Sequence, residues 1–338
     1  MITIWDVARL ANVSKTTVSR VITNSGPVKE DTRKRVEAAM KELNYYPNYM
    51  AQGIRTGKTR TIAMFVPDHT NTFYNSMLTG VEEIALQNDY MIMICNTNKS
   101  SELEIRYAQV LMGRNIDGII YNTYIKNEDN IRYFEKLSKQ LPVVFMDDIF
   151  GRRKNVSFIF SDGCANTRKA VEYLYQLGCR RIAYLRMPPD ISVSLSRFDG
   201  YCDGLKRVGL KYDEQLVYNC EEDEMDMSHI QIGQNGARYF LSLPEAPDAI
   251  LSANDTMAIG SVIYLQRHSV RVPEDIKVVG YDNIDMCTVV QPNLTTIAQP
   301  TKEMGKAAAS MIINDIAGVP NAKRQLIYDC ELIIREST

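Results

Sequence analysis

Residues 3–22 read Thr-Ile-Trp-Asp-Val-Ala-Arg-Leu-Ala-Asn-Val-Ser-Lys-Thr-Thr-Val-Ser-Arg-Val-Ile, and this stretch decides how the N-terminal region folds. Thr3 and Asp6 have the spacing of a capping pair, which predicts that a first helix starts at Thr3. The chain turns at Asn12, and Ser14 is a suitable N-cap for a second helix. Two short amphipathic helices joined by a tight turn form a helix-turn-helix, which places its second helix in the DNA major groove.

The second helix has two chemically different faces. Val18, Val21 and Ile22 recur at helical spacing and predict its inward face. The opposite face carries polar side chains, namely Lys15, Thr16, Ser19 and Arg20. Cationic side chains suit guanine edges or phosphates, and threonine suits thymine or backbone oxygens. The pattern alone would also fit a solvated helical pair that binds nothing.

Two further features favour DNA binding. A third helix is predicted from Glu30 to Leu43, where Tyr45-Tyr46-Pro47 ends it. Residues 1–60 contain 11 Lys and Arg against 5 Asp and Glu, a net charge of +6, whereas the whole chain has a net charge of −2. The remaining residues therefore carry −8. A basic head on an acidic body localises the contact with a polyanion at one end of the chain.

Length and composition describe an ordinary globular protein. The chain has 338 residues, of which 45% are hydrophobic and 24% charged, so two or three folding units are expected. No apolar run approaches the ~18 residues that a membrane span needs, and no targeting signal is recognised. Seven scattered cysteines without a C-x-x-C pair fit a reducing cytoplasm.

From residue 61 onward, short β-branched runs alternate with amphipathic helical stretches. Strands are expected at 61–66, 90–95, 118–121, 143–146, 158–160, 181–185, 249–252 and 276–279, and helices at 73–87, 103–114, 165–177, 197–208 and 257–267. This alternation predicts parallel sheets with helices on both faces. Because two such series occur, before and after about residue 161, we expect two doubly wound subdomains with a ligand site between them, at the carboxyl ends of the strands.

The chain resembles the lactose-repressor and galactose-repressor family of bacterial transcription regulators. The stretches that carry the resemblance are 3–8, 13–21, 43–48, 177–183, 252–255, 278–283 and 294–300. The resemblance implies a helix-turn-helix head over 1–47, a hinge helix over 48–60, and a body over 61–338 that is similar to a type I periplasmic sugar-binding protein. In such a body, a first subdomain would contain about 61–160 and 292–322. The second would contain about 161–291 and 323–338, with the last strand near 326–328.

The resemblance also assigns residues to DNA. In the family, paired hinge helices of a dimer push an apolar residue, usually Leu, into the minor groove, and Ile54 holds that position here. Lys29 replaces a Ser that usually caps the third helix, and could instead touch phosphate. Together with the polar face of the second helix, the expected DNA contacts are Thr3, Ser14, Lys15, Thr16, Thr17, Ser19, Arg20, Asn24, Lys29, Asn48, Ala51 and Ile54.

Polar residues at strand ends are candidates for a ligand site. Asn122, Asp147, Asn254 and Asp282 each follow a predicted strand, and Asp255 could be an ordinary helix N-cap. The family resemblance adds Arg197 as an effector-binding arginine, and Phe73 and Tyr74 as an aromatic wall. Aromatic faces and carboxylates suit a sugar, and Arg197 could equally hold a carboxylate or a phosphate. Each of these polar residues, taken alone, could also be structural.

Other motifs do not support catalysis or a cofactor. Residues 53–59 resemble a phosphate-binding loop, but three residues separate the glycines where four are needed. The histidines at 69, 229 and 268 have no metal spacing, and no catalytic triad or G-x-S-x-G elbow is recognised. The acidic run 221–226 is interpreted as a solvated loop because no calcium-loop pattern accompanies it. We expect no enzyme activity, no metal and no cofactor.

These features predict a repressor that binds a palindromic operator as a homodimer, with a central CG step at Ile54, under allosteric control by a sugar or sugar phosphate. It would act in the cytoplasm, at the nucleoid. A sugar carrier with a vestigial head is the first alternative, and the intact basic head argues against it. An enzyme on the same frame would need a base, a metal or a phosphate loop. Within the family, a protein corepressor could replace the small effector.

Overall fold

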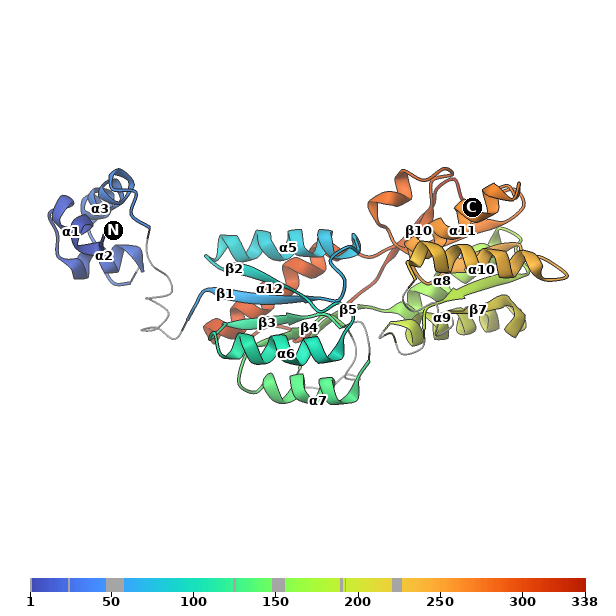
Figure 1. The fold of residues 1–338 in the computed structure, drawn as a ribbon, viewed down its shortest axis with the longest axis horizontal. Coiled ribbons are helices and arrows are strands. Elements are labelled where there is room, and N and C mark those ends of the chain that lie inside the picture. Colours follow the sequence, from blue (N-terminus) through green and yellow to red (C-terminus); the bar gives the residue numbers. More distant parts are fainter. Residues whose placement is uncertain are drawn as a thin grey trace. The chain divides into compact units, whose positions relative to one another are not determined.

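The computed structural model describes residues 2–23, 25–46, 58–123, 126–147, 156–188, 191, 193–220 and 227–338. The chain comprises two compact units, the head (Met1–Arg60) and the body (Thr61–Thr338). Figure 1 shows helices α1 to α3 in the head and two α/β subdomains in the body. The predicted fold class, an all-α head and a body of two parallel-sheet subdomains, is confirmed.

The head packs three helices around a small apolar core. They are α1 (Ile4–Leu10), α2 (Lys15–Ile22) and α3 (Glu30–Glu42). The side chains of Val7, Val18 and Val36 meet at its centre and have no solvent exposure. The turn before α2 passes through Asn12, which adopts a left-handed φ of 51°, a conformation that asparagine tolerates better than most residues. All three predicted helices are confirmed.

The three helices start differently. A capping box joins Thr3 and Asp6 at the start of α1, and the Ser14 hydroxyl accepts a hydrogen bond from the Thr17 backbone N–H at 3.1 Å at the start of α2. Lys29, at the N-cap of α3, makes no capping hydrogen bond through its side chain. A lysine ammonium has no acceptor to offer to a backbone N–H. The start of α3 is therefore left without the cap that its two neighbours have.

The first subdomain contains a parallel sheet in the order β11-β5-β4-β3-β1-β2. Its strands are β1 (Thr61–Val66), β2 (Met91–Asn96), β3 (Gly118–Tyr121), β4 (Val143–Phe145), β5 (Ser157–Ser161) and β11 (Gln325–Tyr328). Its helices are α5 (Phe73–Gln87), α6 (Ser101–Met112), α7 (Glu128–Leu137) and α12 (Thr301–Ala317). Side chains of β1 alternate between two cores, as strand geometry requires. Ile62 and Met64 pack with α5 and α12, and Ala63 and Phe65 pack with α6 and α7.

The second subdomain contains a sheet in the order β12-β10-β9-β8-β6-β7. Its strands are β6 (Ile182–Arg186), β7 (Val217–Asn219), β8 (Ala249–Ser252), β9 (Lys277–Asp282), β10 (Thr295–Ala298) and β12 (Glu331–Ile333). Only β12 pairs antiparallel among them. The helices α8 (Gly163–Gln176) and α9 (Ser194–Arg207) pack on each other, as do α10 (His229–Ser242) and α11 (Asp255–Arg267).

The chain crosses between the subdomains three times, and one predicted crossing is wrong. It leaves the first sheet after β5, returns after β10, and leaves again between β11 and β12. The segment 326–328 was expected in the second subdomain, but β11 pairs with β5 of the first sheet, and Leu326 and Tyr328 pack on the first core. The return also begins after Ala298 rather than near 292, because β10 belongs to the second sheet. A short edge strand carries no local signal of which sheet it will join.

Three further observations concern the described residues. No helix in the described ranges is long and apolar enough to cross a bilayer. Within the same ranges, His, Cys, Asp and Glu form no group of three or more that could hold a metal ion. All seven cysteines are free thiols and are buried or half-buried.

Candidate functional site

The polar face of α2 is presented to solvent. Lys15, Thr16 and Arg20 are exposed, and Thr17 and Ser19 are half-buried. Thr3, Ser14 and Lys29, at the starts of the three helices, are also exposed. The predicted DNA contacts Asn24, Asn48, Ala51 and Ile54 lie outside the described residues. The head therefore offers solvent a face rich in cations and hydroxyls, which is the chemistry that phosphates and base edges accept.

Some hydroxyls of this face already have local partners. The Ser14 and Thr17 hydroxyls lie 2.9 Å apart. The Thr3 hydroxyl and the Thr3 backbone N–H both donate to Asp6 Oδ2, at 2.7 and 2.9 Å, and these two hydrogen bonds lower the pKa of the Asp6 carboxyl. The hydroxyls of Ser14 and Thr3 therefore serve the starts of α2 and α1 before any DNA is bound.

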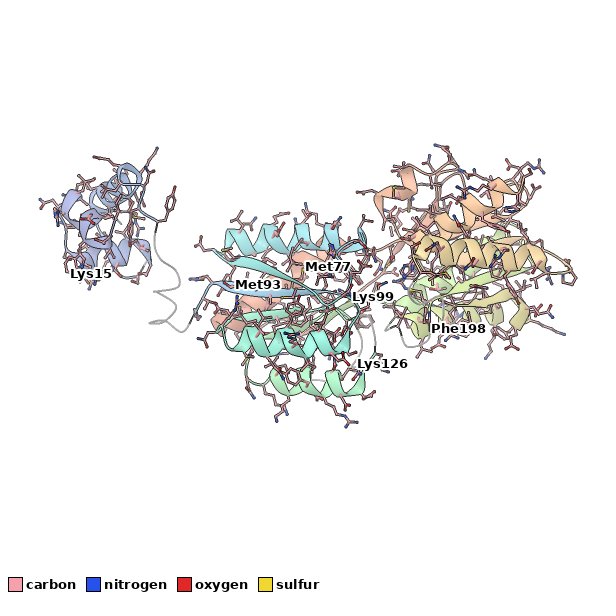
Figure 2. All side chains as sticks on the ribbon, in the orientation of Figure 1. Lys15, Met77, Met93, Lys99, Lys126 and Phe198 are labelled. Carbon is pink, nitrogen blue, oxygen red and sulfur yellow. The ribbon has the colours of Figure 1, made fainter. Side chains whose placement is uncertain are left out.

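The body contains a cavity of about 240 Å³ between its two subdomains. All seven residues that were predicted for an effector site line it: Phe73, Tyr74, Asn122, Asp147, Arg197, Asn254 and Asp282. They come from both subdomains, because α5 and the ends of β3 and β4 belong to the first, and α9 and the ends of β8 and β9 belong to the second. Figure 2 shows Met77, a further lining residue, at the end of the first subdomain that faces the second.

Arg197 of α9 is the most completely engaged residue of the cavity. Its side chain is 6% exposed. Nη1 donates to the Ala253 carbonyl oxygen at 2.5 Å, and Nη2 lies 3.3 Å from Asp282 Oδ1. The guanidinium also lies over the Tyr281 ring, 3.7 Å from its centroid. Its hydrogen-bonding capacity is thus already directed at the protein, which leaves less of it for an anionic ligand.

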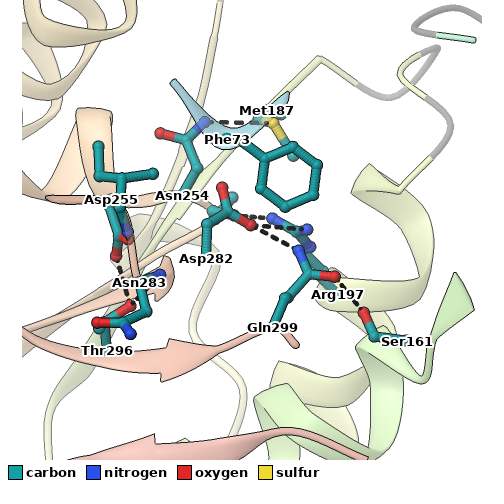
Figure 3. A network of polar contacts seen from close by, with 12 residues as sticks. Phe73, Ser161, Met187, Arg197, Asn254, Asp255, Asp282, Asn283, Thr296 and Gln299 are labelled. Atoms are coloured by element: carbon teal, nitrogen blue, oxygen red, sulfur yellow. Dashed lines mark hydrogen bonds and ion pairs between the residues drawn. The ribbon is translucent and has the colours of Figure 1, made fainter. Parts of the chain in front are cut away.

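Asp282, at the end of β9, is the acidic partner in this network (Figure 3). Gln299 Nε2 donates to Asp282 Oδ1 at 2.7 Å, and the Ser161 hydroxyl donates to Gln299 Oε1 at 2.5 Å. Burial raises the pKa of the Asp282 carboxyl to about 7, against the opposing effect of Arg197. Asp282 also has a φ of 119°, a region that side-chain-bearing residues rarely adopt and that is found disproportionately at functional sites.

The aromatic wall consists of Phe73 and Tyr74 at the start of α5. Their rings contact edge to face, with centroids 5.1 Å apart and planes at 82°. Phe73 lines the same cavity as Arg197 and Asp282, and Figure 3 draws the three side chains together. An apolar ring beside a polar network is the combination that binds a ligand with both a flat face and hydroxyl groups.

The asparagines of the cavity also have structural contacts. Asn122 Nδ2 donates to the Phe65 carbonyl oxygen at 3.0 Å. Asn254 caps α11 by accepting from the Met257 N–H at 2.9 Å, and its Nδ2 lies 3.1 Å from His229 Nδ1. The N-cap of α11 is thus Asn254 rather than Asp255, which corrects the expectation for Asp255.

Asp255 stabilises the fold behind the cavity. It is fully buried, accepts from the Thr296 hydroxyl at 2.5 Å and from the Ile284 N–H at 2.9 Å, and does not line the cavity. Burial raises the pKa of its carboxyl, against those hydrogen bonds.

Several lining residues were missed. Ser161 and Gln299 stand at two of the three crossings between the subdomains, and each follows or ends a strand, so the rule of polar strand ends could have found them. His229 opens α10, and burial lowers the pKa of its imidazole to about 4, with Lys99 adding to the shift. At neutral pH it therefore contributes a neutral hydrogen-bonding group. Nothing in the sequence around His229 signals that position.

Comparisons with known proteins cover nearly the whole chain. Residues 3–48 match the family model for bacterial regulatory proteins of the lacI family, and residues 59–336 match that for periplasmic binding proteins and the sugar binding domain of the LacI family. The HTH-type transcriptional repressor PurR of Vibrio atlanticus (strain LGP32) is 33% identical over 340 residues, which cover 100% of this chain and 98% of the relative.

Two solved structures extend the likeness to the fold. The lac repressor dimer bound to operator and the anti-inducer ONPF has a TM-score of 0.84 and 26% identity, over 99% of this chain and 98% of that one. A complex of the transcriptional regulator CelR with cellobiose has a TM-score of 0.74 and 29% identity, over 100% of both chains. All three proteins are named as regulators of transcription or repressors, not as enzymes.

Proposed function

Because the chain belongs to the LacI family, a family of DNA-binding transcriptional regulators, we propose that it is a repressor controlled by a small effector. It would bind a palindromic operator as a homodimer, and the effector would occupy the cavity between the subdomains. The observation that carries the proposal is the combination of an exposed, cationic α2 face with a buried, polar and aromatic cavity in one chain. As a DNA-bound regulator, it would act in the cytoplasm, at the nucleoid.

The α2 face would read the operator. Lys15, Thr16 and Arg20 have the exposure needed to reach base edges, whereas Thr3, Ser14, Thr17, Ser19 and Lys29 would contact the backbone and fix the register. From the family likeness, Asn24, Asn48 and Ala51 would add contacts, and Ile54 would enter the central CG step of the palindrome.

The charges of the cavity favour a neutral, hydroxyl-rich effector over a phosphorylated one. Among the described residues, three acidic side chains line it, those of Asp147, Asp162 and Asp282, against the single guanidinium of Arg197, and Asp282 is only partly ionised at neutral pH. That guanidinium is already directed at Asp282 and at a backbone carbonyl. In the part of the cavity that the structure describes, a phosphate would meet repulsion from the ionised acidic groups, and the only cation there is already paired, whereas hydroxyl groups can donate to the carboxylate oxygens. We therefore favour a sugar or another neutral polyhydroxy compound.

Control of DNA binding would follow from linkage. An effector that contacts both subdomains stabilises one angle between them. Ser161 and Gln299 stand at two crossings, and the Ser161 hydroxyl donates to Gln299, which in turn donates to the cavity residue Asp282. If the two angles differ in the spacing of the hinge segments 48–60 across the dimer, the effector changes operator affinity by its differential affinity for the two states.

Selection of tight binders from random duplex DNA, at a stated moderate salt concentration, tests the DNA-binding part of the proposal. We expect the purified chain to enrich a palindrome with a central CG step. Failure to enrich any sequence without added ligand, and again with lysate metabolites present, would contradict it and favour a carrier with an inactive head. The genes beside matching sites in the source genome would then nominate effectors.

A thermal-unfolding screen tests the effector class. Neutral mono- and disaccharides and nucleosides are compared with the phosphorylated form of each. A ligand at about 100 times its dissociation constant stabilises the folded state by about 2.7 kcal/mol, which raises the melting temperature of the body measurably. We expect only neutral compounds to do so. Stabilisation by phosphorylated forms alone would contradict the charge argument.

A further inference from the structure

Trp5 is the only tryptophan in the chain, and 60% of it is exposed to solvent on α1. The core of the head does not use it, because α1 buries Val7 and Ala8 instead. Tryptophan is a residue that proteins enrich at interfaces, because its ring offers a large rigid contact area. Because Trp5 is exposed and lies close to the start of α2, its ring can contact the α2 side chains.

Lys15, the first residue of α2, reaches the ring of Trp5. Its ammonium nitrogen lies 5.1 Å from the ring centroid, within the ~6 Å range of a cation–π interaction. Both side chains are exposed, and Figure 2 marks Lys15 on the head. They border one shallow groove, together with Arg9 of α1 and with Ser14 and Thr16 at the start of α2.

This contact changes what Lys15 can do. A lysine has a flexible four-carbon stem and, when exposed, samples many rotamers, so that binding must order it at an entropic cost. The Trp5 ring holds the ammonium on one side of the start of α2. The first residues of a recognition helix are those that meet base edges, and a lysine ammonium can bind guanine O6 and N7. Preorientation by the ring would lower the cost of that contact and would favour one base position over others.

We propose that Trp5 is a positioning residue that determines operator specificity through Lys15, so that α1 and α2 read one base pair together. The inference rests on the proposed function, because it requires that the α2 face enters the major groove. It extends the proposed DNA-reading residues from α2 to Trp5 of α1.

A double-mutant cycle tests the proposal on the operator selected above and on a set of duplexes in which each half-site base pair is changed in turn. The variants of the full chain are Trp5→Leu, Lys15→Met and the double variant, with Trp5→Phe to restore a ring. We expect Trp5→Leu to weaken operator binding about two- to fivefold, the usual strength of an exposed cation–π contact. It should lose discrimination at the same base pair as Lys15→Met, should have no further effect once Lys15 is replaced, and should be rescued in part by Trp5→Phe.

Lys29→Met is the matched control, since Lys29 is an exposed lysine of the same head at the start of α3. Its effect should add to that of Trp5→Leu. Because Trp5 is the sole tryptophan, the emission of the free protein reports on this contact directly, and it should change in Lys15→Met but not in Lys29→Met. If the effects of Trp5→Leu and Lys15→Met are additive, or if Trp5→Leu weakens binding to every duplex equally, the inference is overturned. The proposed function as an operator-binding protein would still stand. If the unaltered chain binds no duplex selectively, the proposed function and this inference both fail.

Discussion

The α2 face of the head, which we propose reads DNA, and the cavity of the body differ in the exposure of their charged side chains. On α2, Lys15 and Arg20 are exposed, and their charges are solvated. In the cavity, Arg197 and Asp282 are buried and paired with each other, with Gln299 and with a backbone carbonyl. A charged side chain that is exposed to water can bind a phosphate or a base edge when the surrounding ions and water are displaced. A buried, paired charge can be used by a ligand only at the expense of the contacts it already makes.

This difference couples stability to ligand binding in the cavity, whereas on α2 stability and DNA binding are independent of each other. In the cavity, a residue that would contact the effector also holds the fold together, so its replacement should damage both. On α2, the side chains that we propose read DNA lie outside the core of Val7, Val18 and Val36. Their replacement should therefore change DNA recognition and leave the folded state as stable as before.

The largest expected effect is that of Arg197→Met on the free energy of unfolding of the body. Above pH 7, where Asp282 is ionised, the change leaves its carboxylate buried without a cation, and breaking a buried pair in this way costs up to about 3–5 kcal/mol. Urea unfolding followed by circular dichroism measures it. Adding Asp282→Asn removes the stranded charge and keeps a side chain of nearly the same shape at this position, so the double variant should recover much of the loss.

Arg207→Met is the matched control, on the same helix. Arg207 pairs with Asp203 at 3.1 Å, but its side chain is 56% exposed. Water solvates both charges once the pair is broken, so the unfolding midpoint should hardly move. If Arg197→Met and Arg207→Met destabilise the body equally, the cavity pair is not the buried structural pair described here.

The second effect concerns Arg20 of the head. Arg20→Ala should leave the thermal unfolding of the protein unchanged but reduce the preference for the selected operator over its base-pair variants by about 1–3 kcal/mol, the value of one good bidentate base contact. Competition binding at fixed salt measures the preference. Lys29→Ala, at a residue expected on phosphate, should instead weaken all duplexes alike and reduce the salt slope by about one. An unchanged specificity ratio in Arg20→Ala would remove Arg20 from the reading face.

The helices of the head were predictable because their signals are local. The capping residues Thr3 and Ser14 and the inward valines lie within a few positions of the elements that they define, and the structure has those elements in place. In the body, helix 73–87 was predicted with its observed bounds, but α7 and α10 were missed. Gly233 and Gly236 lie inside α10 and indicate a loop locally. A Cβ at Gly233 would lie 2.0 Å from the Met257 carbonyl oxygen, so this glycine permits close packing on α11.

The cavity was predictable as far as it obeys strand-end geometry. Asn122, Asp147, Asn254 and Asp282 follow strands, and the structure brings them together because parallel strands end at one edge. The hydrogen-bond partners were not predictable. Gln299 reaches Asp282 because β10 lies beside β9. Asp255 follows β8, on the other side of β9, and is buried against Thr296 of β10 because the three strands are neighbours in the sheet. Such pairings depend on strand order, which no short stretch of sequence encodes.

The third effect is a pH dependence of opposite sign at a buried and an exposed carboxyl. The pKa of Asp282 is raised from 3.8 to about 7, so the unfolded chain releases this proton first as the pH rises, and the contribution of Asp282 to stability falls between about pH 4 and 7. The lowered pKa of His229 acts in the opposite direction over part of this range. Asp275 is exposed and bonded to Arg271, which lowers its pKa to about 2, so its contribution is present above pH 4 and is lost between about pH 4 and 2.

Chemical unfolding at a series of pH values measures both slopes. Asp282→Asn should flatten the fall between pH 4 and 7 by at most about 1.4 kcal/mol per pH unit, the limit for one proton. Glu104 and Asp255, whose pKa values are also raised by burial, keep part of the slope in this variant. Asp275→Asn should alter only the acid limb. A fall between pH 4 and 7 that Asp282→Asn leaves unchanged would show that this carboxyl is not the group that titrates there.

The smallest effect places stability and DNA binding in competition at one residue of the head. Lys29→Ser supplies α3 with the N-cap hydroxyl that it lacks, which should stabilise the helix by about 0.5–1 kcal/mol. Slower hydrogen exchange of the first amides of α3 would report it. Lys34→Ser removes the same charge inside α3, where serine is a poorer helix former than lysine, and should speed exchange instead.

If Lys29 contacts phosphate, Lys29→Ser gains this stability while losing operator affinity, and the loss shrinks at high salt. A gain in stability with full affinity would mean that Lys29 contributes nothing to DNA binding, and the head would then bind through α1 and α2 without the start of α3.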